Sequence, residues 1–289
     1  MPARPFRSRR HFISGTRKSI RMGKLSAVVF CICSMSVAGQ AQGSADRAAD
    51  EPVSLVPPIV GRVVAEPKHS GGIHWGPLVR QWWTFVAIEQ TERIIKETKT
   101  RNQLSGPFVR EWFDTVSVYH FDNWNDGGKI FTSYIAHPAM GATAQAIFWQ
   151  NNDNVRYAEQ DFRSPTYRKA LLQAFAFATV DAVLWKLGPL SESSIGNVGL
   201  PVKWWDRDCK ALGIPCVDRT GVSDMVMNEV GGTAMTIGFQ WLDKHVQKRI
   251  ESRFQNRYLI NTTRMLTYPP QCLANIVRFK APWFRDNRR

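Results

Sequence analysis

The sequence lacks the short motifs that mark many catalytic and nucleotide-binding sites. It has no HExxH motif of a zinc peptidase and no GxSxG nucleophile elbow of a hydrolase. It also has no P-loop or GxGxxG pattern of a nucleotide-binding site. Cysteine is scarce, with five in 289 residues, and the absence of a CxxC pair argues against a structural zinc site. We therefore expect no metal and no cofactor, and function has to be inferred from fold class, charge and clustered polar residues.

Acidic residues are absent from the first 41 positions, and this unbalances the charge of the chain. The formal net charge is +14, from 38 Lys and Arg against 24 Asp and Glu. Eight of these bases lie in residues 1–41, so the remainder carries only +6. Over half of the excess charge therefore belongs to a leader, and we do not expect a nucleic-acid partner.

Residues 1–41 have the features of an export signal. Leu25 to Val37 is a short apolar run with a positive flank before it and small residues after it, which offer cleavage positions. The run is too short for an ordinary membrane span. Met22 begins a compact basic segment of its own and is an alternative start. Ser8-Arg9-Arg10 resembles a twin-arginine motif, so both the general and the twin-arginine route stay open, and either places the protein in the periplasm or envelope.

Export changes what the remaining cysteines indicate. Cys209 and Cys216 enclose a short loop, and in an oxidising compartment we expect them to form a disulfide that closes a flap. Cys272 is then left over, and a buried thiol is the simplest expectation for it.

The rest of the chain predicts a mainly α fold with a single bundle-like domain over residues 71–289. Residues 42–70 are rich in Pro, Gly, Ser and Ala without a helical period and are interpreted as a flexible linker. Ser164 and Pro165 are typical of a helix start, and Ser223 is a second candidate cap. Three apolar stretches with helical character follow one another: Tyr134–Gln150, Ala170–Leu190 and Asp224–Leu242.

The second of these stretches is long enough to raise the question of a membrane span. It contains Asp181 and Lys186, and a central charge costs about 2.5–3.5 kcal/mol on an insertion scale. A buried helix in a helical domain is therefore favoured, and an integral inner-membrane protein is kept as an alternative.

Each apolar helix carries polar residues at helical spacing, and these predict a shared buried network. Its expected members are His137, Gln145, Gln173, Asp181 and Asn228. Burial without a partner is costly for such groups, so they should meet one another where the helices pack. A glycine at position 141, between the first two members, predicts a close approach by another helix, and Gly231, Gly232 and Gly238 suggest the same for the third helix.

A catalytic use of this network is the second interpretation. Its candidates are His137, Glu192, Asp224 and Glu229, which could supply a general acid and base in an envelope hydrolase. The simpler interpretation gives His137 a packing role, Asp224 a place in the first turn of a helix and Glu192 a loop-ordering role. Packing is favoured, and the balance is against an enzyme.

The C-terminal region is basic and aromatic. Arg253, Arg257, Lys280 and Trp283 are its marked residues, and an amphipathic basic helix with aromatic residues nearby is typical of a membrane-surface anchor. The favoured function is therefore a non-enzymatic, exported protein that binds a membrane surface or another envelope component. The sequence carries no signal for an oligomeric state.

Three motifs resemble those of bacterial exported, helix-rich families of unknown function. They are an HPxxG helix at His137 to Gly141, the Ser-Glu-x-Ser-Ile-Gly-Asn loop at Ser191 to Asn197, and a glycine-containing helix from Asp224 to Gly232. Gly196-Asn197 stands here where those families have Asn-Asp. The resemblance covers roughly residues 130–245 and implies an envelope-associated helical module, with no reaction to carry over.

Overall fold

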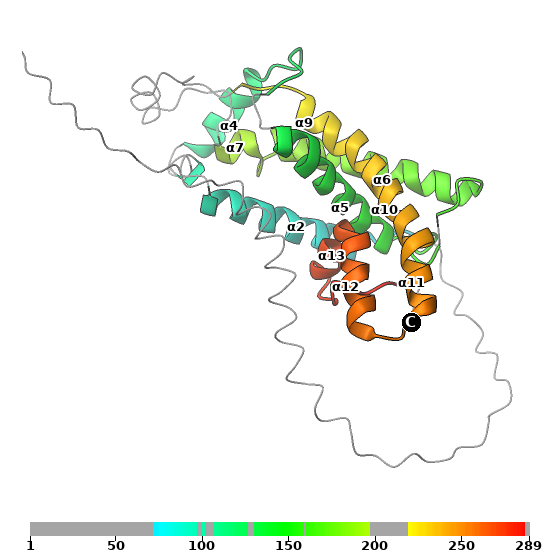
Figure 1. Ribbon diagram of the computed structural model, residues 1–289. Helices are drawn as coiled ribbons and strands as arrows, with labels where there is room; N and C mark the ends of the chain where they lie inside the picture. Colours follow the sequence, from blue (N-terminus) through cyan, green and yellow to red (C-terminus); the bar gives the residue numbers. More distant parts are fainter. Residues whose placement is uncertain are drawn as a thin grey trace, which may run out of the picture. The chain divides into compact units, whose positions relative to one another are not determined.

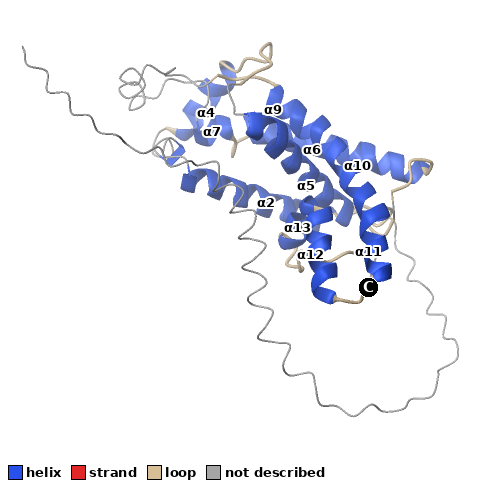
Figure 2. Cartoon of the chain, in the orientation of Figure 1, coloured by secondary structure: helices blue, strands red, loops and turns tan. Residues whose placement is uncertain are grey.

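The computed structural model describes residues 72–96, 100–101, 104, 107–126, 130–158, 160–196 and 219–286, all of which belong to one unit, Val64–Arg289. This part of the chain is mainly α-helical, as predicted, and has no β-strand (Figures 1 and 2). The predicted signal, the linker and the Cys209–Cys216 disulfide with its flap lie outside the described residues.

Several of the helical elements run into one another without a break. Thus η3 leads directly into α5, and a continuous helical stretch runs from α9 to α11. The elements are α2 (Trp75–Lys96), α4 (Phe108–Ser117), η3 (Thr132–Ala136), α5 (His137–Gln150), α6 (Pro165–Leu187), α7 (Glu192–Gly196), α9 (Ser223–Val226), η4 (Met227–Gly231), α10 (Gly232–Leu242), η5 (Asp243–Gln247), α11 (Lys248–Arg253), α12 (Arg257–Thr267) and α13 (Pro269–Ile276).

The helix starts show where local sequence decides the structure and where it does not. The Ser164 hydroxyl accepts a hydrogen bond from the Tyr167 amide at 3.3 Å, which confirms the predicted cap of α6. The predicted cap at Ser223 is wrong, because Ser223 is the first helical residue and Val222 precedes it without a side-chain bond. Instead the Ser223 amide donates to the Trp124 carbonyl at 2.8 Å, so a tertiary contact satisfies this helix start.

Helix α5 is at the centre of the described part. Every residue from Gly141 to Gln150 is buried, and the helix packs against α2, α6, η4, α10 and α13 (Figure 1). Ile147 and Phe148 join Leu78 of α2 and Ala274 of α13 in the largest hydrophobic cluster. A helix that is apolar on all sides is expected in such a central position.

Small residues allow α5 and the helix that begins at η4 to approach very closely. A Cβ at Gly141 would lie 1.8 Å from the Asn228 carbonyl oxygen, and one at Gly232 would lie 2.9 Å from the Gly141 carbonyl carbon. The predicted close contact at these glycines is therefore confirmed. It is wrong for Gly238, where a Cβ would meet nothing within 4 Å.

Candidate functional site

A buried lysine with three carboxylates lies near the C-terminal end of α6. The Lys186 Nζ is 2.7 Å from Glu192 Oε2, 2.8 Å from Asp224 Oδ2 and 3.2 Å from Asp126 Oδ2. The lysine side chain is only 5% exposed. We call these four residues the Lys186 cluster. Such an arrangement compensates one buried cation with more than one anion.

The local structure around α7 positions Glu192. The Ser191 hydroxyl accepts hydrogen bonds from the Ser193 and Ser194 amides, and the Ser194 hydroxyl accepts one from the Ser191 amide at 2.8 Å. This reciprocal pattern is a capping box in which serine takes the place of the usual Glu or Gln. The Ser193 hydroxyl also donates to the Lys186 carbonyl at 2.6 Å, which holds α7 against the end of α6. The result is that Glu192 faces the lysine.

Two further segments bring Asp224 and Asp126 to the same place. Asp224 lies in the first turn of α9, where its charge suits the positive end of the helix dipole. The backbone bond from Ser223 to Trp124 ties the start of α9 to the loop that carries Asp126. Both carboxylates therefore reach Lys186 from outside α6.

His137 joins the cluster through Asp224. Its Nε2 lies 2.8 Å from Asp224 Oδ2, the same oxygen that contacts Lys186. The imidazole is 4% exposed and opens α5 directly after η3. Within the described residues its Nδ1 has no hydrogen-bond partner, and neither has Asp224 Oδ1. His137 thus connects the central helix to the cluster and leaves one ring nitrogen unused.

Asp181 is a separate buried acid on the same helix as Lys186. Its Oδ1 accepts a hydrogen bond of 2.6 Å from the Trp82 indole of α2. Burial raises the pKa of Asp181 to about 6, although hydrogen bonds from Trp82 and Asn228 and the nearby His137 act in the opposite direction. This acid links α2 to α6 and η4.

Charge attraction within the Lys186 cluster overcomes the cost of burial. Burial opposes ionisation of Glu192, but Lys186 and Arg93 lower its pKa to about 2. Burial also opposes ionisation of Asp224, yet the hydrogen bond from His137 and the charge of Lys186 hold its pKa well below the usual range. For Lys186, burial favours the neutral amine, while the three carboxylates raise its pKa well above the usual value. The cluster therefore stays charged around neutral pH, which suits a structural role better than proton transfer.

The structure brings together three of the four residues considered for catalysis. His137, Glu192 and Asp224 all belong to or contact the Lys186 cluster. Glu229 is only half-buried, and it is not among the groups that contact Lys186; burial raises its pKa. In the part of the chain that the structure describes, no group of three or more His, Cys, Asp or Glu residues is arranged to hold a metal ion.

The residues expected in the buried network have different surroundings. His137, Asp181 and Asn228 lie around the contact between α5, α6 and η4. Gln145 is fully buried and donates from Nε2 to the Thr233 hydroxyl at 2.7 Å, which connects α5 to α10. Gln173 is half-buried.

Sequence reasoning missed Lys186 and Asp126 as cluster members. The available signal was a lysine inside an apolar helix, which has to find counter-charges if the helix is buried. Nothing in the local sequence indicates that Asp126, 60 residues earlier, is one of them.

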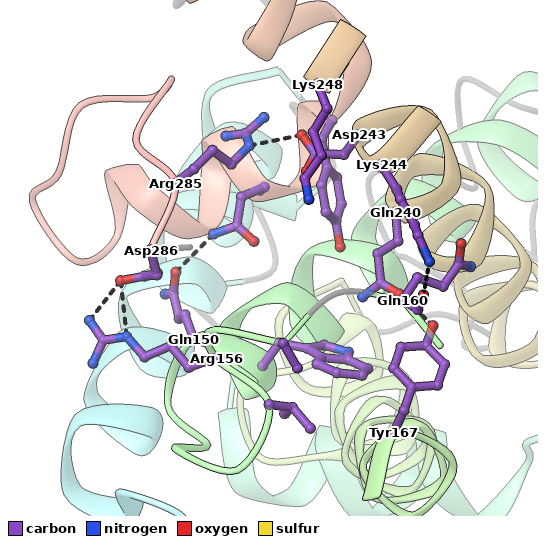
Figure 3. A pocket seen from close by; sticks show the side chains of 15 residues that line it. Gln150, Arg156, Gln160, Tyr167, Gln240, Asp243, Lys244, Lys248, Arg285 and Asp286 are labelled. Carbon is purple, nitrogen blue, oxygen red and sulfur yellow. Dashed lines mark hydrogen bonds and ion pairs between the residues drawn. The ribbon is translucent and has the colours of Figure 1, made fainter. Parts of the chain in front are cut away.

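A second polar site is a cavity of about 80 Å³ between α5, α6, the α10–α11 stretch and the C-terminal segment (Figure 3). Lys244 donates to the Gln160 carbonyl at 2.6 Å, and the Tyr167 hydroxyl donates to Gln240 at 2.6 Å. On another side Arg156 pairs with Asp286 at 2.8 Å. None of the residues of the Lys186 cluster lines this cavity.

The C-terminal region combines exposed cations with exposed apolar side chains. Arg253, Arg257 and Lys280 are exposed, and Trp283 is half-buried. Neither α11 nor α12 has a buried residue. The apolar side chains exposed in this region are Phe254, Tyr258, Leu259, Leu266 and Phe279.

Phe279 has an unusual backbone conformation for an aromatic residue. After α13 the Lys280 amide donates to the Asn275 carbonyl, and the Phe279 amide donates to the Ile276 carbonyl, both at 2.9 Å. These two bonds form a Schellman motif, whose left-handed position is usually glycine. Here it is Phe279, with a φ of 59° and a side chain that is 90% exposed.

No protein-family model, curated protein or solved structure matches this chain.

Proposed function

We propose that this is an exported cell-envelope protein without enzymatic activity that binds an anionic membrane surface through its C-terminal region. The observation that carries the proposal is the exposed, left-handed Phe279. A non-glycine residue in this conformation costs roughly 1–2 kcal/mol. The ring is 90% exposed and returns little of that cost through packing within the described structure. A hydrophobic environment outside the chain would compensate for it, since burying a Phe side chain contributes about 1.5–3 kcal/mol.

Exposed cations of the C-terminal region support a lipid surface as that environment. Lys280 follows Phe279 directly, and Arg253 and Arg257 flank the start of α12. Each cation close to an anionic membrane contributes about 1 kcal/mol. Tyr258 and Leu266 are 82% and 71% exposed, so α12 also offers apolar side chains that the described chain leaves uncovered. A basic helix with uncovered apolar residues is typical of proteins that lie on a membrane.

Flotation with liposomes tests this proposal. The full chain should float with vesicles that contain phosphatidylglycerol and much less with phosphatidylcholine alone. Recovery only in the soluble fraction with both vesicle types would contradict the proposal.

A Phe279→Gly variant separates the backbone strain at this position from the proposed membrane contact of its ring. Glycine should relieve the backbone strain and raise the melting temperature, while the loss of the ring weakens flotation. Phe121→Ala is a matched control, because Phe121 is also well exposed, at 59%, but lies outside the C-terminal region. Equal flotation of wild type and Phe279→Gly would show that Phe279 is not an anchor.

Export and the resemblance to bacterial exported helical families belong to the same proposal. The basic, apolar leader over residues 1–41 supports export. An oxidising compartment supports a Cys209–Cys216 disulfide, and the packing of several helices around α5 supports a bundle-like domain.

An integral membrane protein is the second candidate, and α6 favours it. By length and composition alone, one described stretch, Pro165–Ile195, could cross a membrane. Leu172, Val180 and Val183 are exposed along it. Against a span stand Asp181 and Lys186, which bind partners from other helices. Extraction of membranes with carbonate distinguishes the candidates, because a surface-bound protein is released and an integral one is retained.

A hydrolase centred on His137 has one supporting observation, the unpartnered buried Nδ1. The ring is 4% exposed, and His137 does not line the cavity of Figure 3. A catalytic base has to reach its substrate, so this closed position favours the packing role.

A further inference from the structure

The cavity in Figure 3 has an excess of positive charge. Its lining contains four cations and two carboxylates, a formal excess of two positive charges. The cations are Arg156, Lys244, Lys248 and Arg285, and the carboxylates are Asp243 and Asp286.

The two carboxylates are already engaged by arginines. Asp286 pairs with Arg156 and with Arg278, each at 2.8 Å, and Asp243 lies 3.4 Å from Arg285 Nε. Lys244 instead donates to a neutral carbonyl, that of Gln160. An ammonium group has three donors, so Lys244 has charge and donor capacity left at the cavity.

Trp149 supplies a second, independent donor. It lines the cavity and is 7% exposed, and its indole Nε1–H has no hydrogen-bond partner in the described residues. An unpaired donor at a buried position is unfavourable, so an acceptor bound in the cavity within reach of this N–H would stabilise the protein. A water molecule would satisfy the indole but would not offset the charge. An anionic oxygen does both.

We propose that this cavity binds a phosphate group. A cavity of about 80 Å³ has room for several water molecules, which is enough for a phosphate group. Phosphate oxygens accept hydrogen bonds from lysine, arginine and indole donors. The bonds from the charged donors, lysine and arginine, are the strongest. The phosphate is carried either by a small soluble compound or by the headgroup of a lipid. This site uses residues other than Phe279, Arg253 and Arg257, so it stands or fails independently of the proposed membrane contact of the C-terminal region.

Titration calorimetry of the full chain with inorganic phosphate, at constant ionic strength, is the first experiment. Saturable binding is expected, and Trp149→Phe should weaken it about tenfold, because this change removes the N–H and keeps the aromatic ring. Trp185→Phe is the matched control. Trp185 is also buried, at 6% exposed, with an unpartnered Nε1, but it does not line the cavity.

Lys244→Gln tests the charge in the same way, with exposed Lys169→Gln of α6 as its control. It should weaken binding at least tenfold while circular dichroism shows an unchanged fold. Equal affinity of wild type, Trp149→Phe and Lys244→Gln would overturn the proposal.

Vesicles distinguish the two sources of the phosphate. Vesicles with phosphatidic acid, phosphatidylglycerol or phosphatidylcholine alone are compared for wild type and both variants. Phosphatidic acid binding that needs Trp149 and Lys244 would assign a lipid headgroup. Binding of inorganic phosphate that needs both residues, with vesicle binding unaffected by either change, would assign a soluble phosphate compound. Absence of variant-sensitive binding in both experiments would refute a phosphate site, whatever the flotation of Phe279→Gly shows.

Discussion

Lys186 Nζ and Asp224 Oδ2 lie 2.8 Å apart, and each side chain is only 5% exposed. The two residues are 38 positions apart and join the end of α6 to the start of α9. Both charges lose their hydration on folding, so each depends on the other and on the surrounding hydrogen bonds. His137 contacts the same carboxylate oxygen and connects the pair to α5. With Glu192 of α7, the cluster therefore joins four helices, α5, α6, α7 and α9.

Removal of the lysine should strongly destabilise the protein. Lys186→Met leaves buried carboxylates without their cation, and loss of one partner of a buried pair typically costs about 3–5 kcal/mol. Urea unfolding followed by circular dichroism measures the change. Exposed Lys169→Met on the same helix should stay within about 0.5 kcal/mol of wild type. A loss below about 1 kcal/mol for Lys186→Met would mean that the cluster contributes little to stability.

Acid should weaken the fold through Glu192. Its folded pKa is about 2, below its ordinary value of 4.5, so the folded state binds the proton less readily than the unfolded state. The stabilisation is complete above pH 4.5 and is lost as the pH falls toward 2. Glu192→Gln should lower the free energy of unfolding at pH 7 by about 1–3 kcal/mol and flatten its dependence on pH in this window. An unchanged slope of melting temperature against pH would contradict this.

Ionisation of Asp181 should destabilise the protein, whereas ionisation of Glu192 stabilises it. Its folded pKa of about 6 lies above the ordinary 3.8, so the folded state retains the proton longer and ionisation between these values weakens the fold. Asp181→Asn keeps an oxygen acceptor for the Trp82 indole and removes the buried charge. We expect it to stabilise the protein by on the order of 2 kcal/mol at pH 8 and to have little effect at pH 4. Thermal unfolding at both pH values checks the difference, and a destabilisation at pH 8 would show that the charge itself is needed.

Two glycines offer a paired test of helix packing. Gly141→Ala places a methyl group 1.8 Å from the Asn228 carbonyl oxygen, so it should cost about 1–3 kcal/mol or more. Gly238→Ala meets nothing within 4 Å and lies inside α10, so the better helix propensity of alanine should stabilise the protein by up to about 1 kcal/mol. Denaturant unfolding of both variants measures the contrast. Equal effects would show that the close approach at Gly141 relaxes without cost.

Thiol counting tests the predicted disulfide and the remaining cysteine. In exported, processed protein, Cys209 and Cys216 should be unreactive toward a thiol reagent even after denaturation, unless a reductant is added. Cys272 is half-buried in the described structure, and burial raises its pKa to about 11. It should therefore react slowly in the native state and rapidly after unfolding. Three reactive thiols after denaturation without reductant would rule out the disulfide.

Much of the helical structure follows from local sequence. Apolar runs with helical spacing predict the stretches that became α5, α6 and α10, and Ser164 with the following proline predicts the start of α6. Ser223 was misinterpreted because the Trp124 carbonyl, 99 residues earlier, satisfies that helix start. For the candidate site, polarity pointed to His137, Glu192 and Asp224, but it did not single out Lys186 as the cation between them.

The sequence by itself determined that apolar helices carry polar and charged side chains that burial would force to find partners. Charge, spacing and small residues are local properties and can be counted. Only the tertiary structure decided the pairing, because Lys186 contacts partners that are 6, 38 and 60 residues away. The free energy of each contact depends on how far the packed helices bury both side chains. The left-handed conformation of Phe279 is likewise set by the turn after α13, and no pattern of residue types predicts it.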